Sequence, residues 1–276
     1  MKISMPQQPG RLPRSGAQTM PARKGHAAAM VLAGATFAAC WLIALRLRAG
    51  VDYPLMRALN AALTLPLEVD LALAWLTTYY LFTGVLLMAL IWYCWFACPD
   101  ALSRSRVLCG TVAAFLAGIA GRCLQLALPT HARPLHDAAL GIAFRAIDPA
   151  ELNHWSAFPS DHAAVQFGLA AVVLLLCRRL GVAALIWAAL LNLVRVHLGV
   201  HYPTDVIGGA ALGVLAVLLG QGVAMPVGMR LVAWEGQAPG GFHAVAFFLS
   251  YQIATLFDEA RTAALAILHL LRHGGA

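Results

Sequence analysis

Residues 158–205 read FPSDHAAVQFGLAAVVLLLCRRLGVAALIWAALLNLVRVHLGVHYPTD. Two long apolar runs flank the pair Arg178-Arg179, and each run has ionisable residues at its far end. Such runs are typical of transmembrane helices, which need about 20 apolar residues to cross roughly 30 Å of hydrocarbon. A tight turn makes two helices antiparallel neighbours. The stretch therefore predicts a helical hairpin in a membrane, with polar groups at its open end.

The rest of the chain has the same character. Of 276 residues, 61% are hydrophobic and only 11% are charged, whereas soluble domains carry about 25% charged residues. We predict an all-α, polytopic membrane protein: a six-transmembrane-helix bundle with additional interfacial helices. The predicted spans are 27–45, 70–97, 107–129, 161–177, 181–200 and 204–225.

The apolar runs also predict the domain organisation. Residues 1–25 are expected to be a disordered basic cytoplasmic tail, and residues 26–226 the six-span membrane domain, with a short interfacial helix within 47–69. Residues 227–276 are mixed in character and predict cytoplasmic or interfacial amphipathic helices. An extra helix packed on the bundle is the alternative for this last segment.

The basic residues indicate a membrane topology. The formal net charge is +7, but the positive residues gather at the ends of apolar runs, a pattern that orients membrane helices and gives no reason to expect nucleic-acid binding. The tail, the loop with Arg104 and Arg106, and the turn at Arg178-Arg179 are expected to be cytoplasmic, although Arg46, Arg48, Arg57, Arg133 and Arg145 fall on the opposite side. The six cysteines lie in or beside apolar runs and are expected to be small buried side chains.

Helix length places several polar residues at one membrane level. His162 lies 16 residues before Arg178, and Arg195 lies 16 residues after Arg179. At 1.5 Å per residue both lie about 24 Å from the turn, on the same side. Arg133, just past the third span, ends there too. The set expected at this level is Arg133, Ser160, His162, Arg195, His201 and Asp205.

These residue types suit phosphoryl chemistry. Arginines offer forked donors to phosphate oxygens, and a histidine can serve as nucleophile or as acid and base. Asp205, four residues after His201, can accept a proton from one ring nitrogen and leave the other free to attack. Ser160 and the first N–H groups of the fourth span can bind an anion. The plainer alternative is that single histidines and arginines here only extend toward the interface, and that Asp205 only begins a helix.

In three segments the chain resembles the type 2 phosphatidic-acid phosphatase superfamily, which includes lipid phosphate phosphatases, undecaprenyl-diphosphate phosphatases and soluble vanadium haloperoxidases. That family's pattern is Lys, six residues, Arg-Pro; then Pro-Ser-Gly-His; then Ser-Arg, five residues, His, three residues, Asp. The matching residues are Arg133-Pro134, then Pro159-Ser160-Asp161-His162, then Arg195, His201 and Asp205. The resemblance covers about residues 107–215.

Three positions depart from the family pattern. Asp161 replaces the glycine of the second segment, and Val194 replaces the serine of the third. Leu126 stands where the pattern has lysine, so one phosphate-binding cation is missing or displaced. Arg122, one helical turn deeper on the same face, is the favoured substitute, and His131 is the other. Arg122 could instead pack against a neighbouring helix.

The resemblance implies a metal-independent lipid phosphate phosphatase without a cofactor. By this resemblance His201 is the nucleophile that forms a phosphohistidine, His162 the acid and base, and Asp205 the residue that orients His201. Arg133, Ser160 and Arg195 would hold the phosphate, with Arg122 or His131 as further ligands. The implied site faces the periplasm or outside from a bacterial inner (plasma) membrane.

Several alternatives remain at this point. The favoured substrate is an undecaprenyl-diphosphate-like polyprenyl lipid, and phosphatidic acid and phosphatidylglycerophosphate also suit the site. The same residues would serve a phosphotransferase that passes the phosphate to an acceptor. A non-enzymatic lipid transporter or scaffold is a weaker alternative. The expected partners are the lipid phosphate and membrane lipids, and the sequence does not indicate an oligomeric state.

Overall fold

The computed structural model describes residues 23–98, 100–129, 131–148, 150, 156–255 and 258. These residues form helices and loops, with no strand among them, which confirms the predicted all-α class. The predicted basic tail at 1–25 lies almost wholly outside the described residues. The end of the predicted C-terminal segment, after 258, also lies outside them.

The helices follow the apolar runs. Their bounds are α1 Arg23–Leu42, α2 Arg48–Ala62, α3 Leu67–Thr78, α4 Leu86–Ala97, α5 Ala101–Ala127, α6 Asp161–Leu176, α7 Arg178–His197, α8 Pro203–Val223, α9 Met225–Gln237 and α10 Pro239–Ala254. Two π-helical turns, Ile43–Leu47 and Leu81–Val85, precede α2 and α4. The loop after α5 contains two short 3-10 turns, Pro134–His136 and Ala138–Leu140.

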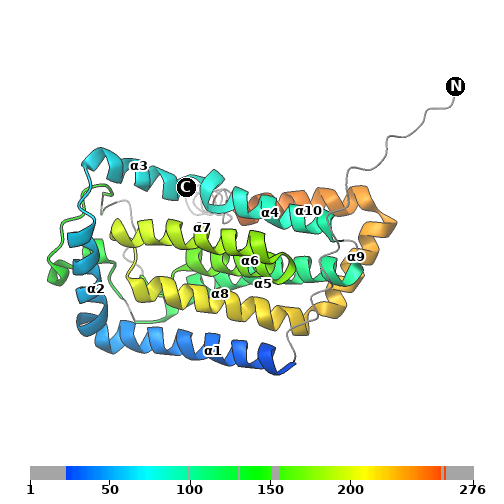
Figure 1. Ribbon diagram of the computed structural model, residues 1–276, viewed down its shortest axis with the longest axis horizontal. Coiled ribbons are helices and arrows are strands. Elements are labelled where there is room, and N and C mark those ends of the chain that lie inside the picture. Colours follow the sequence, from blue (N-terminus) through cyan, green and yellow to red (C-terminus); the bar gives the residue numbers. More distant parts are fainter. Residues whose placement is uncertain are drawn as a thin grey trace, which may run out of the picture.

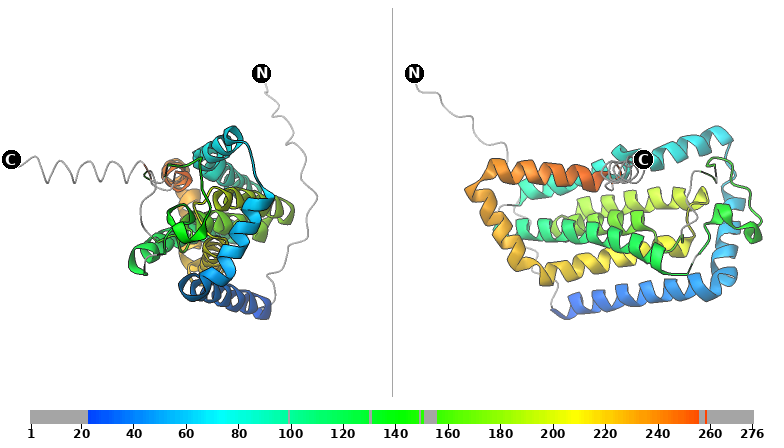
Figure 2. Two further views of the ribbon diagram at one scale, coloured as in Figure 1. Left: turned by 90° about the vertical axis from the view of Figure 1, so that its left-hand side faces the viewer. Right: turned by 180° about the vertical axis from the view of Figure 1, so that it is seen from behind.

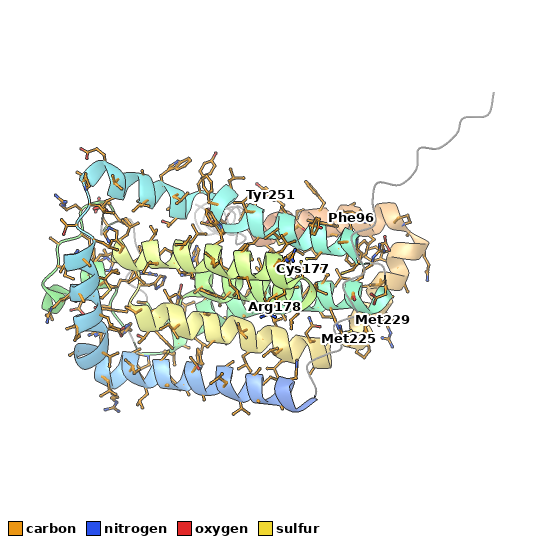
Figure 3. The ribbon with its side chains drawn as sticks, viewed as in Figure 1. Phe96, Cys177, Arg178, Met225, Met229 and Tyr251 are labelled. Atoms are coloured by element: carbon orange, nitrogen blue, oxygen red, sulfur yellow. The ribbon has the colours of Figure 1, made fainter. Side chains whose placement is uncertain are left out.

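The long helices run side by side along one axis (Figure 1). α6 is central and contacts α4, α5, α7 and α8, and α1 lies against α8. α2 crosses one end of the bundle and links α1 to α3, as the end-on view of Figure 2 shows. We call this the α2 end. Figure 3 labels Met225 and Met229 on α9 at the opposite end, called here the α9 end.

The helices support a multi-pass membrane protein but not the exact span count. Four helical segments are long and apolar enough to cross a membrane: Gly25–Ala62, Ala101–Ala127, Arg178–His197 and Pro203–Val223. α3 and α4 form a fifth span only if taken together, because they are bent by 55° at a break. α6 has 16 residues, fewer than the roughly 20 that a full crossing needs. The predicted six spans are therefore four or five by length and composition among the described residues.

Small residues allow the central helices to touch. A methyl group on Gly209 of α8 would overlap the backbone oxygen of Ser160, and one on Gly213 would overlap that of Ala164. Such small residues permit close backbone approach between membrane helices. As a result, the first turns of α6 and α8 lie against each other at the α2 end.

Backbone carbonyl groups at the break between α3 and α4 accept hydrogen bonds from side chains. In a membrane such groups must be satisfied by other protein groups. Side chains from α6 and α7 donate to them: Arg195 Nη1 to Thr77 O (3.2 Å), Trp187 Nε1 to Phe82 O (2.9 Å) and Gln166 Nε2 to Thr83 O (3.1 Å). The broken span is thus attached to the bundle through its own backbone.

The segment after α8 folds back on the bundle. α9 lies across the α9 end, and α10 runs beside α4 (Figure 1). The indole N–H of Trp92 donates to Ser250 (3.1 Å), and the ring of Trp95 stacks on Phe242 with centroids 5.3 Å apart. Of the two arrangements that the sequence left open, α10 adopts the packed one.

Candidate active site

Three distant stretches of chain meet at the α2 end. The loop after α5, the start of α6 and the turn between α7 and α8 are joined through their backbones. The bonds run from Leu135 N to Gly199 O (3.0 Å), from Ala157 N to His131 O (2.7 Å) and from Ser160 N to Asp205 O (3.0 Å). Together with the last turn of α7 and the first turn of α8, these stretches carry every site residue predicted from the sequence except Arg122, which joins them from α5.

His201 lies in the turn before α8, and its side chain is 1% exposed. Its Nδ1 lies 3.1 Å from the carbonyl oxygen of Ala157 and 3.6 Å from Oδ2 of Asp205. A carbonyl oxygen only accepts hydrogen bonds, so Nδ1 carries the proton. In the neutral ring Nε2 then has a free lone pair, which is the arrangement that a nitrogen nucleophile needs.

Asp205 is fully buried in the first turn of α8, and its Oδ2 accepts a backbone hydrogen bond while its Oδ1 has no hydrogen bond from a described residue. The backbone N–H of Tyr202 donates to Oδ2 (2.8 Å), which closes a capping box. Oδ1 lies 3.3 Å from Nε2 of His131. Next to it, the backbone N–H and hydroxyl of Thr204 donate to Asp52 of α2. The helix start that positions Asp205 is therefore held from two sides.

Two arginines keep buried donors free. Arg133 donates through Nη1 to the carbonyl oxygen of Val200 (2.9 Å), and Arg195 donates to the broken span. The Nε–H of each has no partner among the described residues, although both nitrogens are buried. Buried donors are nearly always paired. Two unpaired guanidinium N–H groups near one histidine are a suitable site for an anion with several oxygens.

His162 lies in the first turn of α6, with a side chain 24% exposed. Its Nδ1 is 3.0 Å from Oδ1 of Asp161, which also accepts the backbone N–H of His162 (2.9 Å). Ser160 caps the helix and accepts the N–H of Ala163 (3.3 Å). His162 is thus the more accessible of the two histidines at this site.

The structure gives both candidate substitutes for the missing lysine specific neighbours. Nη2 of Arg122 lies 2.6 Å from Oδ2 of Asp161. His131 is buried between Asp205 and Arg48, whose Nη1 is 3.4 Å from Nδ1 of His131. His131 therefore lies beside Asp205, on the side that faces Arg48 of α2. Leu126 is 65% exposed.

The surroundings of His201 keep its ring neutral. Burial lowers the pKa of His201 to about 4, more than the hydrogen bond and charge of Asp205 raise it, and the positive charges of Arg133 and Arg195 lower it further. Burial likewise lowers the pKa of Arg133, against the charges of Asp161 and Asp205. These interactions between charges show that the arginines, the carboxylates and His201 share one electrostatic environment.

Two carboxylates of this arrangement are not predicted by the sequence. The family pattern marks Asp161 only as a departure, yet Asp161 contacts both Arg122 and His162. The sequence predicts only an interfacial helix around Asp52, whereas in the structure Asp52 is fully buried against α8. A carboxylate within an apolar stretch is a signal that could have singled out Asp52, because such a residue needs a partner.

Comparison with known proteins supports the family resemblance. Residues 130–223 match the family model described as the PAP2 superfamily. The chain is 43% identical over 58 residues to a lipid A 4'-phosphatase of Bacteroides thetaiotaomicron, covering 20% of this chain and 26% of that protein. It is 40% identical over 63 residues to the bacitracin transport permease protein BcrC of Bacillus licheniformis, covering 23% and 31%. No solved structure matches.

The matched segments span less than a third of either relative. The family match, however, includes the second and third motif segments in full, together with Arg133-Pro134 of the first. It also contains the residues that meet at the α2 end, apart from Arg122 and the α2 side chains. Residues 130–223 are thus similar to the PAP2 superfamily, which confirms the resemblance drawn from the three motif segments.

Proposed function

We propose that the protein is a membrane lipid phosphatase in which His201 attacks phosphorus and forms a phosphohistidine. The observation that carries this proposal is the buried, neutral His201 together with two arginines whose Nε–H groups have no partner in the described part of the chain. A phosphoryl group bound there would satisfy both donors and lie against the free Nε2. The resemblance to a family of phosphatases supports the same reaction.

In the first step a bond forms between Nε2 of His201 and phosphorus while the bond from phosphorus to the lipid oxygen breaks. His162 donates its Nε2 proton to that leaving oxygen. The equatorial phosphoryl oxygens gain charge as this happens, and Arg133 and Arg195 stabilise that charge. Asp205 and the carbonyl of Ala157 hold the Nδ1 proton of His201, so the ring becomes cationic without turning.

In the second step water replaces the histidine. His162, now neutral, accepts a proton from water as the water oxygen bonds to phosphorus. The P–N bond to His201 breaks, and its electron pair returns to Nε2. Inorganic phosphate leaves, and both histidines are restored to their starting protonation. The two steps consume one water and release one lipid alcohol, or a lipid monophosphate if the substrate is a diphosphate.

The proposed substrate is a lipid with a terminal phosphate or diphosphate. We favour a polyprenyl diphosphate such as undecaprenyl diphosphate; phosphatidic acid and phosphatidylglycerophosphate meet the same requirement. One relative's name refers to the removal of a phosphate from lipid A, which is also a membrane lipid. We place the reaction on the periplasmic side of a bacterial inner membrane, since Arg104, Arg106, Arg178 and Arg179 lie at the starts of α5 and α7, whose other ends reach the site.

The test is phosphate release by the purified full-length protein in detergent, with a chelator present. The panel contains undecaprenyl diphosphate, phosphatidic acid, phosphatidylglycerophosphate and lipid A. His201→Gln should reduce the rate by about 10³-fold or more, as loss of a nucleophile does. It should also abolish the acid-labile phosphoprotein seen after rapid quenching of labelled substrate.

The matched control is His197→Gln, a histidine one turn earlier that pairs with Asp70 (2.8 Å). This variant should remain active. Equal phosphate release by His201→Gln and the native protein would exclude the proposed nucleophile. No phosphate release by the native protein on any lipid of the panel would favour a lipid transporter or scaffold. Release of phosphate that depends on an added alcohol or sugar acceptor would instead identify a phosphotransferase.

A further inference from the structure

Asp161 occupies the position at which the family pattern has glycine, and its carboxylate lies between two side chains of the site. Oδ2 is 2.6 Å from Nη2 of Arg122, and Oδ1 is 3.0 Å from Nδ1 of His162. The charged groups Arg122, Asp161 and His162 therefore form a continuous row from α5 to the start of α6.

Close packing of α5 against α6 creates this row. A methyl group on Gly121 would lie 3.3 Å from the Cα of Asp161, so the two backbones nearly touch there. Arg122 is the next residue along α5 and reaches the carboxylate directly. The backbone N–H of His162 donates to the same Oδ1 that faces the ring (2.9 Å). Asp161 is thus held by its own helix and by its neighbour.

The direction of these bonds defines the state of His162. A carboxylate only accepts, so Nδ1 of His162 carries a proton. Nε2, on the opposite side of the ring, is then the position that exchanges protons during the reaction. A second hydrogen bond on a catalytic histidine commonly selects its tautomer and orientation. A glycine at position 161 cannot make such a bond.

We propose that Asp161 is a positioning residue that orients His162 for proton transfer, with Arg122 holding its carboxylate in place. The inference rests on the proposed phosphatase function. Asp161 stays ionised in both steps: the Nε2 proton of His162 moves to the leaving oxygen, and a proton from water later replaces it. Each of the two catalytic histidines then has an aspartate beside it, Asp205 for the nucleophile and Asp161 for the acid and base.

A purely structural role makes a different prediction. The pair Arg122–Asp161 could simply attach α5 to α6, as a partly exposed ion pair between two helices. In that case its loss would affect all substrates alike. If Asp161 instead orients His162, its loss should slow only reactions in which the leaving group must receive a proton. Substrates with different leaving groups therefore separate the two roles.

The experiment measures kcat/KM of Asp161→Asn on two substrates. Dioctanoyl phosphatidic acid has an alkyl leaving group that needs a proton, whereas p-nitrophenyl phosphate has a leaving group that departs as an anion. The parameter kcat/KM reports the steps up to the transfer of the phosphoryl group to His201. We expect a loss of about 10²-fold on the alkyl substrate and of less than about threefold on the nitrophenyl substrate, the range of general acid catalysis.

Asp70→Asn is the matched control, because Asp70 pairs with His197 in the same way (2.8 Å) and lies outside the site. Asp70→Asn should leave the ratio of kcat/KM on the alkyl substrate to kcat/KM on the nitrophenyl substrate at its native value. Arg122→Met should show part of the selective loss on the alkyl substrate that Asp161→Asn shows. Arg122→Lys, which keeps a positive charge beside Asp161, should behave like the native protein. If Asp161→Asn does not fold, Arg122→Met carries the test, since it releases the carboxylate without removing it.

Each outcome separates the two proposals. If the native protein releases no phosphate from any substrate, the proposed function fails and the role of Asp161 falls with it. If the native protein is active and Asp161→Asn loses both substrates equally, or neither, only the positioning role is overturned. A loss of kcat/KM on the alkyl substrate alone, which Asp70→Asn does not show, supports the positioning role of Asp161.

Discussion

At the scale of single residues, His201 combines burial with a neutral ring. Its pKa of about 4 lies below the value of about 6.5 expected in the unfolded chain. Between these values the unfolded state binds a proton that the folded state does not. The contribution of the neutral His201 to the free energy of unfolding is therefore fully present above about pH 6.5 and decreases as the pH falls toward 4.

This linkage predicts a pH-dependent difference between the native protein and His201→Gln. From pH 7 to pH 5 the native protein should lose about 2 kcal/mol relative to the variant, at about 1.4 kcal/mol per pH unit below 6.5. Thermal unfolding of both proteins in the same detergent at the two pH values measures it. A Tm difference that does not change with pH would show that His201 titrates normally.

His131 makes a second prediction at this scale. Because its Nε2 faces Oδ1 of Asp205 at 3.3 Å, we expect His131→Leu to disturb Asp205 and to lower kcat by about tenfold, comparable with the loss of an outer hydrogen-bonding partner. KM should change little. A raised KM with unchanged kcat would instead support the other possibility, that His131 binds the substrate phosphate.

Sequence reasoning reached the residues of the site but not all of their partners. Helix length was enough to place His162 and Arg195 at one level, because the rise per residue is constant. The contact of Arg195 with Thr77 and that of Asp52 with Thr204 join elements that no periodic pattern relates. Such pairings depend on how helices and loops pack, which spacing along the chain does not encode.

At the scale of elements, close contact between α6 and α8 holds the site together. Gly209 and Gly222 both lie in α8, but only Gly209 faces a neighbouring backbone; nothing lies within 4 Å of a methyl group on Gly222. We expect Gly209→Ala to separate the two helices, with a loss of stability of about 1–3 kcal/mol. Activity should fall with it, since Ser160 and Asp205 would move apart.

Gly222→Ala is the matched control. In a helix alanine is favoured over glycine by about 0.5–1 kcal/mol, so this variant should be as stable as the native protein or slightly more stable. Thermal unfolding and phosphate release of both variants provide the comparison. Equal behaviour of the two variants would mean that the glycine contact does not control helix spacing.

The broken span shows why element boundaries were harder to predict. Residues 70–97 form an almost continuous apolar run with no proline, so a single helix was the simplest expectation. The 55° bend between α3 and α4 is instead accommodated by donors on α6 and α7. These donors are about 80–120 residues away in sequence, which is why local pattern did not reveal the break.

At the scale of the whole molecule, the proposed topology places the α2 end outside and the α9 end inside. Gly50 on α2 and Gly236 on α9 are both exposed, with nothing within 4 Å of an added methyl group. In a background without the native cysteines, Gly50→Cys should react with a membrane-impermeant maleimide in intact cells. Gly236→Cys should react only after permeabilisation. The opposite pattern would reverse the orientation.

The unequal lengths of neighbouring helices have a consequence for substrate choice. α6 begins beside Gly121, whereas α5 continues to Ala127, six residues or about 9 Å farther. The first turn of α6, which carries His162, therefore begins below the end of α5 along the bundle axis. In the proposed function, a phosphate at the tip of a lipid would reach that depth, whereas one capped by a bulky headgroup would be stopped by the end of α5. How far the phosphate can enter the protein, rather than recognition of a particular lipid tail, would then decide which lipids are hydrolysed.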